Sequence, residues 1–538
     1  MNDKGHRRVA KGRRKFQCPV PSTLAIVLSS FVLLSYAFCL LGVVFFLDQD
    51  SDESARHLQV RKGGKFLYTE SIEGEDEDGQ SDKYPFDSSD VYIPKAKWPV
   101  SLRDEVGNFE TIKHPADPEK FLTVPSFWSP PIHENGLMSR ATAMRIGSCE
   151  VPDDKGEYAR GADCPIHQRT IFLMIASYRD FQCRETIESI YGRAMYPSRI
   201  RVGVVDQIIE GTDNRCTDPI KPCMEDPEQA LCKYAHLIDA VTLDAHLSVG
   251  PSPARHVGHR MYRGEYYAVQ SDAHVSFVVN WEMSLIHELE STGNDMAVMS
   301  TYLSDFYGSI DEDGNSKKKA RPIMCNSRFQ WSKKGYHIHH STQPESYPKI
   351  HGSPQMHPWW SAGFSFSRGH FFVNVPYDWL QPMVFSGEEM SIAIRGFTIG
   401  YDYYTPEKSV CFHHYAESKE GKEKRKNVPT FWENTEDYEE LGILSMRRML
   451  GIVHMNPDVD KDTWDHTDED RYGLGGVRKP EQLFSLLGID VENHTMEGHL
   501  CHFVDSGDMH VLLSEHLRDD GMGIDYSSVT YQWQDDKD

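Results

Sequence analysis

Four short apolar segments, each followed by a polar residue, constrain the fold of this chain more than any other feature of its sequence. The segments cover residues 170–176, 200–205, 237–243 and 266–270. Apolar residues recur at helical spacing over residues 185–194, and residues 251–264 can form a second helix. Strands that alternate with helices predict an α/β sheet, in which ligands gather at the carboxyl ends of the strands. The residues at those ends are Ser177, Asp206, Asp244 and Asp272.

The last of these strands ends on Asp272-Ala273-His274. Residues two apart in an extended backbone face the same side, so Asp272 and His274 can hold one divalent cation and leave positions open for a phosphorylated ligand. The D-x-H pattern is not specific, because it also occurs at residues 244–246 and 508–510. Its alternative interpretation is a capped strand end.

Composition excludes one class of partner. The chain has 538 residues and a net charge of -24, whereas nucleic-acid-binding proteins present a basic face. The length allows about two to four domains, and a hydrophobic fraction of 39% is enough for a sizeable core. We therefore expect one large catalytic domain with appendages and no nucleic-acid partner.

An uncharged segment near the N-terminus predicts a membrane anchor. Residues 23–47 contain no charged side chain, which is long enough to cross a bilayer and longer than the core of about 7–15 residues in a cleavable signal peptide. Basic residues precede the segment and acidic residues follow it, so the positive-inside rule leaves the N-terminus in the cytosol. The sequence predicts a single-pass type II Golgi membrane protein with a lumenal catalytic domain. A cleaved signal peptide is the alternative.

The region after the anchor has the composition of a stem. Residues 73–78 read EGEDED, and few apolar residues with clustered acid predict disorder near the membrane. Toward the end of this region, Phe127, Trp128, Pro130 and Pro131 could pack on a folded domain. The predicted organisation is a cytosolic basic tail (1–22), a signal anchor (23–47), an acidic stem (48–167), a catalytic domain (168–490) and a C-terminal extension (491–538).

Cysteine content suits the same compartment. Nine cysteines follow the uncharged segment, and an oxidising lumen favours pairing among them. The odd number leaves at least one thiol free or in an intermolecular bond. Cys216, Cys223 and Cys232 lie in one loop and are plausible partners. The Asn493-His494-Thr495 sequon is a possible glycosylation site.

Four segments in a fixed order carry a family resemblance. They are IFLMIASYRD (171–180), GPSPARHVGHRMYRGEYYAVQSDAH (250–274), WWSAG (359–363) and FSGEEMSIAIRGFTIGYDYYTPEKSVCFHHY (385–415). Together they resemble the GlcNAc-transferase family, which includes a hydroxyproline GlcNAc-transferase and is distantly related to the polypeptide GalNAc-transferases. The resemblance covers roughly residues 168–490. It implies a GT-A fold, a UDP-sugar donor, Mn²⁺ or Mg²⁺ as cofactor, and transfer with retention to a hydroxyl acceptor.

The resemblance also implies a metal-binding set. Asp272 and His274 match the D-x-H of the family, and His413 matches the position of a third ligand. His414 competes with His413 for this role. Neighbouring residues of a strand point to opposite faces, so only one of them should reach the metal, and we favour His413.

Donor contacts follow from the same resemblance. Arg255 is placed to meet the donor diphosphate, where a charge-assisted contact would help the leaving group; a surface ion pair is the alternative. Ser177, Arg179 and Asp206 resemble nucleotide contacts, with Asp206 suited to accept a hydrogen bond from uracil or ribose. Arg179 could instead pair with Asp180.

Two carboxylates are the candidate catalytic residues. Glu388 and Glu389 precede a predicted helix over residues 390–397, and stabilisation by the helix dipole is their ordinary role. The resemblance places one of them, preferably Glu388, against sugar hydroxyls or the acceptor. The WWSAG segment supplies aromatic walls, and its Gly363 allows a sugar ring to approach closely.

Two further segments have simpler interpretations. The histidine-rich residues 336–357 predict an acceptor-facing loop, with a second metal site as the alternative, and the charged residues 419–426 predict a solvated segment. The predicted reaction moves a hexose, expected to be GlcNAc, from a UDP-sugar to a Ser, Thr or hydroxyproline of a polypeptide, or to a glycan. A non-haem iron oxygenase and a non-catalytic sugar-binding protein are the alternative functions.

Overall fold

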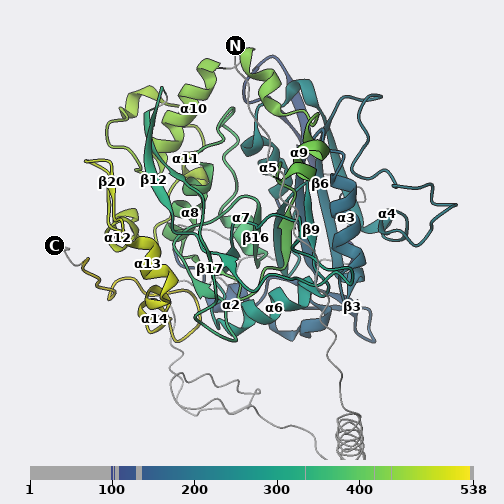
Figure 1. Ribbon diagram of the computed structural model, residues 1–538, viewed down its shortest axis with the longest axis horizontal. Coiled ribbons are helices and arrows are strands. Elements are labelled where there is room, and N and C mark those ends of the chain that lie inside the picture. Colours follow the sequence, from purple (N-terminus) through teal and green to yellow (C-terminus); the bar gives the residue numbers. More distant parts are fainter. Residues whose placement is uncertain are drawn as a thin grey trace, which may run out of the picture. The chain divides into compact units, whose positions relative to one another are not determined.

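The computed structural model describes residues 98–100, 102, 108–128, 136–333, 335–416, 418–437 and 439–533 (Figure 1). The predicted basic tail, the predicted anchor at residues 23–47 and the acidic cluster of the stem lie outside these residues. Within the described part, no helix is both long and apolar enough to span a bilayer.

An eight-stranded mixed sheet forms the centre of the fold, with strand order β15-β17-β10-β16-β8-β5-β6-β7. The strands are β5 (Ile171–Tyr178), β6 (Ile200–Ile208), β7 (Ile238–Asp244), β8 (Tyr267–Asp272), β10 (Ala297–Ser300), β15 (Gln355–Met356), β16 (Phe364–Arg368) and β17 (Asp402–Thr405). The four predicted strands are confirmed as β5, β6, β7 and β8. The α/β class is therefore confirmed, with antiparallel pairs added at β16 and β15.

The parallel part of the sheet changes direction beside β5. The chain passes from β5 to β6 and β7 on one side and then returns to place β8 on the other side of β5. Ligands bind at such a switch point, beyond the carboxyl ends of the strands. The register aligns Ala176 of β5 with Asp272 of β8, and Ser177 of β5 with Asp206 of β6. Ala176, Ser177, Asp206 and Asp272 are thus fixed close together near the carboxyl ends of their strands.

Helices cover the sheet and continue beyond it (Figure 1). The described residues form α2 (Arg140–Ala143), α3 (Cys183–Gly192), α4 (Ala230–Lys233), α5 (Pro251–His259), α6 (Trp281–Ser291), α7 (His370–Asn374), α8 (Glu388–Ile399), α9 (Lys419–Arg425), α10 (Glu439–Ile452), α11 (Glu469–Tyr472), α12 (Pro480–Leu486), α13 (Leu500–Asp505) and α14 (Asp508–Ser514). The three predicted helices are confirmed as α3, α5 and α8. Pro251 opens α5, where its fixed φ and missing N–H fit the first helical position.

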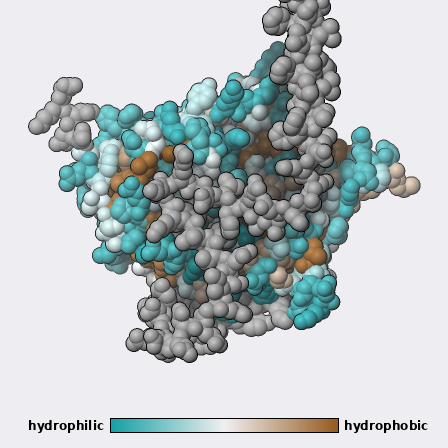
Figure 2. Space-filling model, turned by 90° about the horizontal axis from the view of Figure 1, so that it is seen from below, coloured by the Kyte–Doolittle hydropathy of each residue, from teal (hydrophilic) through white to brown (hydrophobic). Residues whose placement is uncertain are grey.

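The described residues also form short antiparallel strand pairs that are separate from the central sheet. They are β1 (Phe109–Lys113) with β2 (Phe121–Pro125), β3 (Ser148–Pro152) with β4 (Tyr158–Arg160), β9 (Val275–Phe277) with β18 (Cys411–His413), β11 (Arg321–Pro322) with β14 (Glu345–Ser346), β12 (Ser327–Ser332) with β13 (Gly335–His340), and β19 (Ile489–Asp490) with β20 (Thr495–Met496). The visible face in Figure 2 is mainly hydrophilic, with apolar residues in small separate groups.

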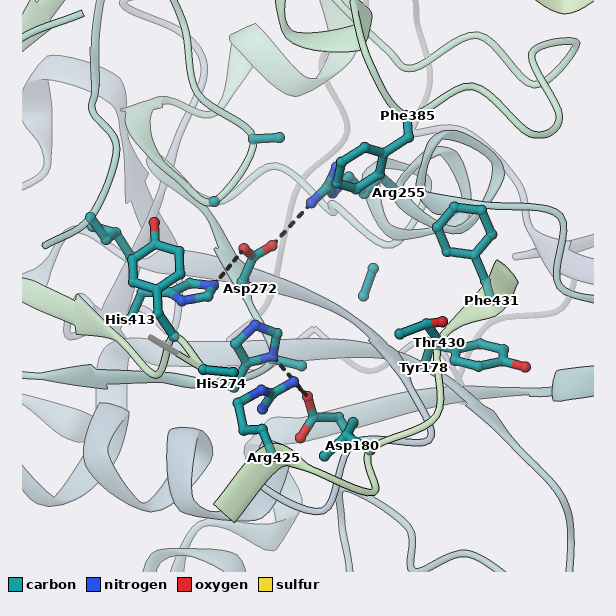
Figure 3. Close-up of a pocket in the computed structure, with 18 of the residues that line it drawn as sticks. Tyr178, Asp180, Arg255, Asp272, His274, Phe385, His413, Arg425, Thr430 and Phe431 are labelled. Atoms are coloured by element: carbon teal, nitrogen blue, oxygen red, sulfur yellow. Dashed lines mark hydrogen bonds and ion pairs between the residues drawn. The ribbon is translucent and has the colours of Figure 1, made fainter. Parts of the chain in front are cut away.

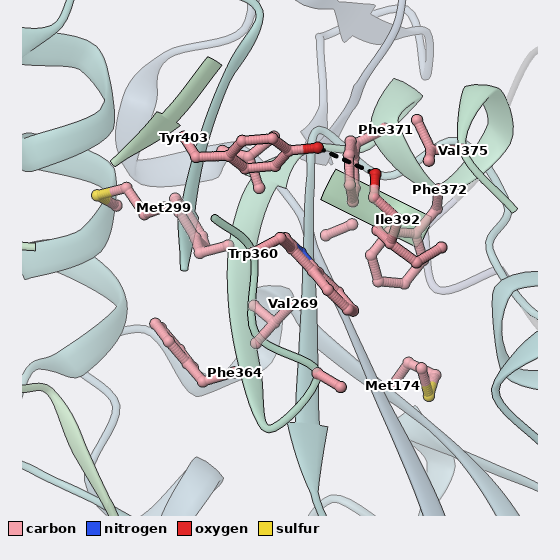
Figure 4. Close-up of a cluster of buried hydrophobic side chains, with 14 of the residues drawn as sticks. Met174, Val269, Met299, Trp360, Phe364, Phe371, Phe372, Val375, Ile392 and Tyr403 are labelled. Carbon is pink, nitrogen blue, oxygen red and sulfur yellow. Dashed lines mark hydrogen bonds between the residues drawn. The ribbon is translucent and has the colours of Figure 1, made fainter. Parts of the chain in front are cut away.

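The buried core occupies both faces of the sheet, and helices α7 and α8 cover one of these faces (Figure 4). Met174, Val269 and Phe364 of neighbouring strands and Phe371 of α7 are fully buried. Burying one such side chain stabilises the fold by about 1.5–3 kcal/mol. The strands that carry the site are therefore held by continuous apolar packing.

The folded region extends beyond the predicted catalytic boundaries at both ends. Trp128, in the predicted stem, packs edge-on against Tyr262 at 5.5 Å between ring centroids. In the predicted C-terminal extension, Cys501 is joined to Cys325 by a disulfide. Aliphatic residues of both segments, among them Val124 and Leu513, are also buried in the core.

All nine predicted lumenal cysteines lie in the described residues. The disulfides are Cys149–Cys164, Cys183–Cys216, Cys223–Cys232 and Cys325–Cys501. Cys411 is buried and free. Cys223 and Cys232 pair as the loop suggested, whereas Cys216 reaches across to Cys183 at the start of α3.

Glu288 of α6 makes the stability of the fold depend on pH. Its buried carboxylate accepts a hydrogen bond from the Glu407 backbone N–H at 2.6 Å, and burial raises its pKa to about 7. A raised pKa means that the stabilisation is complete at low pH and is lost as the pH rises through about 7. We expect Glu288→Gln to reduce the fall in unfolding free energy between about pH 5.5 and about pH 8, by up to about 2 kcal/mol.

Denaturant titrations at both pH values measure this difference. Glu312→Gln, at an exposed loop position, is the control and should keep the wild-type dependence. Equal pH slopes for wild type and Glu288→Gln would show that Glu288 does not titrate in this range.

Candidate functional site

A cavity of about 680 Å³ opens at the carboxyl ends of β5 and β8 (Figure 3). It collects most of the residues predicted from the sequence, which come from four elements and two loops. The predicted residues that line it are Arg255, Asp272, His274, Gly363, Glu388, Glu389 and His413.

Three of these residues form a candidate metal centre. Asp272 ends β8, and the chain turns through His274 into β9, which pairs with β18 so that His413 lies opposite Val275. One ligand atom from each of Asp272, His274 and His413 lies within 4.8 Å of the others. His413 Nε2 is 3.4 Å from Asp272 Oδ2, and the two imidazole rings cross at 80°. Side chains far apart in sequence thus converge on one point.

His414 points away from this centre. Its Nε2 lies 3.0 Å from Ser276 Oγ, and its ring packs on Phe306. Alternation along β18 therefore brings His413, and not His414, to Asp272. Burial and the neighbouring His274 lower the pKa of His413 to about 4, so its ring is neutral and can act as a ligand.

Asp180 holds the second ring nitrogen of His274. The Asp180 Oδ2 atom is 2.7 Å from His274 Nδ1 and accepts a second hydrogen bond from Arg425 at 2.9 Å. Burial opposes the charge on Asp180, but these two partners lower its pKa below the usual range. Sequence reasoning considered Asp180 only as a partner of Arg179, which it does not contact, and assigned Arg425 to a solvated segment.

Arg255 lies between two carboxylates. Its guanidinium donates to Asp272 Oδ1 at 3.0 Å and to Glu388 Oε1 at 2.5 Å. Burial opposes the charge of Arg255, but Glu388 and Asp272 more than offset this and raise its pKa. Burial likewise opposes the charge of Asp272, while His413 and Arg255 lower its pKa. Arg255 is therefore a permanent cation inside the cavity, and not a surface ion pair.

Glu388 and Glu389 begin α8 at the cavity wall. Glu388 accepts a hydrogen bond from Ser252 at 3.0 Å, and burial raises its pKa to about 7 against the opposing effect of Arg255. Glu389 accepts from Tyr302 at 2.7 Å and from the Ala362 backbone N–H at 2.8 Å, and burial raises its pKa as well. Hence Glu388 is the carboxyl closer to Arg255, and Glu389 shapes the loop before β16.

Gly363 allows this loop to pass close to the metal centre. A Cβ atom at Gly363 would lie 3.2 Å from Asp272 Oδ2. The Asp272 backbone N–H donates to the Gly363 carbonyl at 3.1 Å. A side chain here would crowd the carboxylate.

The predicted nucleotide contacts do not line this cavity. Ser177 is fully buried, and its hydroxyl has no hydrogen-bond partner among the described residues. Asp206 accepts from the Cys216 backbone N–H at 2.8 Å, and burial raises its pKa to about 6. Arg179 pairs with Asp213 at 2.8 Å and Glu433 at 2.8 Å. Their role as nucleotide contacts stays a prediction.

An aromatic rim closes one side of the cavity and was not anticipated from the sequence. It consists of Phe385, Phe431 and Trp432, with Phe431 and Trp432 at 4.2 Å between ring centroids. Phe385 is 54% exposed and Trp432 is 45% exposed. The sequence feature that could have indicated this rim is the adjacent pair Phe431-Trp432, which follows the charged residues 419–426.

The histidine-rich segment 336–357 begins as a strand of a hairpin, β13, and continues as a loop that contains the short strands β14 and β15. Residues 327–340 pair as β12 and β13. His340 is close to the cavity wall, with Nε2 3.2 Å from the Trp360 carbonyl and 3.9 Å from Glu389 Oε2. Among the described residues, the Asp272 set is the one group that meets the geometry of a metal site. The alternative of a second metal site in this segment therefore has no support.

Comparisons with known proteins give one family match. The family model described as Glycosyltransferase (GlcNAc) matches residues 170–222 and 210–493. No curated protein matches the chain. Solved structures resemble it at low identity and low TM-score. GalNAc-T7 with UDP, GalNAc and Mn²⁺ is 14% identical with a TM-score of 0.35, over 56% of this chain and 51% of that chain, so the likeness spans about half of GalNAc-T7.

Two other likenesses are of the same kind. S. aureus TarS 1-349 in complex with UDP-GlcNAc is 11% identical with a TM-score of 0.31, over 59% of this chain and 71% of that chain. Mannosyltransferase PcManGT from Pyrobaculum calidifontis, with GDP-Man and Mn²⁺, is 12% identical with a TM-score of 0.28, over 53% of this chain and 73% of that chain.

Proposed function

Because this chain belongs to the GlcNAc glycosyltransferase family, we propose that it transfers GlcNAc from UDP-GlcNAc to a hydroxyl group, with retention of the anomeric configuration. The observation that carries the proposal is the convergence of Asp272, His274, His413 and Arg255 on one cavity at the switch point of the sheet. A candidate cation site and a fixed positive charge at a switch point support a sugar diphosphate as the ligand, because ligands of α/β sheets bind there.

The side chains present fit a divalent cation. Two imidazoles and one carboxylate suit a first-row metal ion such as Mn²⁺ and leave coordination positions open. His274 can offer Nε2 because Nδ1 is engaged by Asp180. A bound cation would stabilise the negative charge that develops on the departing diphosphate. Asp272, His274 and His413 are the residues that would hold it.

Arg255 supplies the second positive charge for the leaving group. Its position is fixed by Asp272 and Glu388, so it needs little reorganisation when the bond to the sugar breaks. In the proposed reaction, the acceptor oxygen bonds to the anomeric carbon while the bond to UDP breaks. The acceptor proton passes to the leaving phosphate on the same face.

Glu388 and Glu389 are proposed to contact the sugar or the acceptor. Glu388, with a pKa of about 7, can accept or donate a hydrogen bond to a sugar hydroxyl near neutral pH. Glu389 supports Ala362 and Gly363, past which the sugar ring would lie. The exposed aromatic rim offers flat apolar faces to the acceptor.

A polypeptide acceptor, with Ser, Thr or hydroxyproline as the modified residue, is the proposed substrate class, and a glycan is the second candidate. The proposed location is the Golgi membrane, with one N-terminal helix and a lumenal domain. Protease protection in intact microsomes tests this topology. Digestion of the catalytic region without detergent would contradict it.

UDP release from UDP-GlcNAc in the presence of Mn²⁺ is the direct test of function. Acceptor-dependent release with hydroxyl peptides supports the proposal, and release only with free sugars or lipid-linked glycans would rule out the polypeptide acceptor. Turnover that needs 2-oxoglutarate in place of a UDP-sugar would favour an oxygenase. Donor binding without turnover on any acceptor would favour a sugar-binding protein.

A further inference from the structure

Asp180 is a buried carboxylate with three donors at the edge of the candidate metal centre. It is the second residue after β5, and its side chain is 4% exposed. Its Oδ1 accepts from the Gln182 backbone N–H at 2.9 Å, and its Oδ2 accepts from His274 Nδ1 and from Arg425 Nη2. Figure 3 shows the His274 ring between Asp180 and Asp272. The carboxylate is held from both sides and cannot rotate freely.

The hydrogen bond between Asp180 and His274 determines which ring nitrogen of His274 can bind a cation. When Nδ1 donates its hydrogen to a carboxylate, the ring is fixed in the tautomer that leaves the Nε2 lone pair free. Histidines that bind metals commonly donate the other ring N–H to a carboxylate, and loss of that partner weakens metal binding by about 10–100-fold. Asp180 therefore lies where it can orient His274, which it contacts directly, without itself contacting the metal.

Arg425 connects Asp180 to a different part of the chain. It is the last residue of α9, and it donates to Asp180 at 2.9 Å and to the Gln182 side chain at 2.6 Å. Val428 to Trp432, which follow α9 closely, line the same cavity. We call the described residues 418–432 the cover segment. Arg425 of this segment fixes the Asp180 carboxylate by a hydrogen bond, and its Phe431 and Trp432 form part of the aromatic rim.

We propose that Asp180 and Arg425 are positioning residues of the metal centre. Asp180 orients His274, and Arg425 holds the Asp180 carboxylate and couples cation affinity to the seating of the cover segment. The proposal rests on the proposed function, because it assumes that Asp272, His274 and His413 bind the cation. Neither Asp180 nor Arg425 is a ligand in it.

The sign of one substitution separates this role from simple electrostatics. Arg425 is a positive charge close to a cation site, so its removal should strengthen cation binding if charge alone matters. If Arg425 positions Asp180, its removal should weaken cation binding. Lys424 is the matched control, because it lies on the same helix and carries the same charge. Its Nζ pairs with Glu185 Oε2, 2.7 Å away, and not with Asp180.

The experiment measures binding of Mn²⁺ alone to the full chain, from the loss of the free-ion signal in electron paramagnetic resonance. We expect Arg425→Ala to raise the Mn²⁺ Kd about tenfold, and Lys424→Ala to leave it unchanged or slightly lower. Arg425→Lys should give an intermediate Kd, because a lysine can reach one of the two acceptors. Mn²⁺ binding by Arg425→Ala as tight as by Lys424→Ala would overturn the coupling.

Two Asp180 variants keep the proposal falsifiable if Arg425→Ala does not fold. Asn retains an oxygen that accepts from His274, so Asp180→Asn should bind Mn²⁺ more tightly than Asp180→Ala. Equal Kd values for the two would overturn the orienting role. Asp272→Ala in the same titration tests the premise: if it binds Mn²⁺ normally, the metal centre itself is wrong, whatever the other variants show.

Discussion

Replacing Asp272 by alanine is expected to abolish nearly all sugar transfer, a loss of at least about 10²–10³-fold. The variant removes the one carboxylate that lies within reach of both imidazoles and also removes a partner of Arg255. This stabilisation acts only when charge develops on the leaving group, so the loss falls on kcat. UDP release measured against Mn²⁺ concentration gives the effect.

The same tripeptide elsewhere in the chain provides the control. Asp244-Ala245-His246 matches the site motif in sequence, but Asp244 caps a short turn by accepting from the His246 N–H at 3.0 Å. Both side chains are more than half exposed. His246→Ala should therefore keep substantial activity and its Mn²⁺ dependence. Normal turnover by folded Asp272→Ala, with melting curves that match wild type, would show that the wrong copy was chosen.

Asp272→Asn separates charge from shape. It keeps the size of the side chain and most of its hydrogen bonds but removes the negative charge that a cation needs. We expect its loss of activity to approach that of Asp272→Ala. Recovery of activity in the asparagine variant would indicate a structural role for Asp272.

Strand ends were the part of the site that the sequence could predict. Continuous apolar runs identify β5, β6 and β8, and polar residues after them mark the edge where ligands bind. His413 followed from its place in the family pattern, and its choice over His414 agrees with alternation along β18. Local periodicity and motif order carry this information, so no knowledge of packing was needed.

Side-chain parity explains why Ser177 and Asp206, two of the predicted nucleotide contacts, do not line the cavity. Ala176 and Tyr178 line the cavity, so Ser177 between them must face the opposite side of the sheet. Asp206 is aligned with Ser177 in the parallel register, whereas Asp272 is aligned with Ala176. Residues in register share a face, which puts Asp272 in the cavity and Asp206 behind it. The register between strands cannot be derived from one strand at a time.

Asp180 and Arg425 could not be paired from the sequence for a different reason. They are 245 positions apart, and each belongs to a segment whose charge is typical of solvated surface. Only the packing of α9 beside the turn after β5 brings them together. Long-range ion pairs of this kind have no local signature, since any buried carboxylate could be matched with any of many basic residues.

Arg255→Ala is expected to reduce transfer by about 10²–10³-fold and to destabilise the fold by about 3–5 kcal/mol. Removal of the guanidinium leaves Asp272 and Glu388 without their shared cation. Free guanidinium added to the assay should restore part of the activity if the lost group acts on the leaving diphosphate. No rescue in a variant that folds and binds Mn²⁺ would indicate that Arg255 only supports the cavity.

The two losses caused by Arg255→Ala should respond differently to a second substitution. The Glu388 pKa of about 7 already includes the lowering effect of Arg255, so in Arg255→Ala it should rise further and the carboxyl should be neutral at pH 7. A carboxyl with a raised folded-state pKa loses its stabilisation as pH rises, and in wild type this loss is complete above about pH 7, so the stability deficit of Arg255→Ala should grow as the pH rises above about 7.

A double variant tests the same ion pair in another way. Combining Arg255→Met with Glu388→Gln replaces the ion pair by neutral groups of similar size, and we expect it to recover most of the unfolding free energy but none of the activity. Recovery of both the unfolding free energy and the activity would mean that the charge on Arg255 serves the fold and takes no part in sugar transfer.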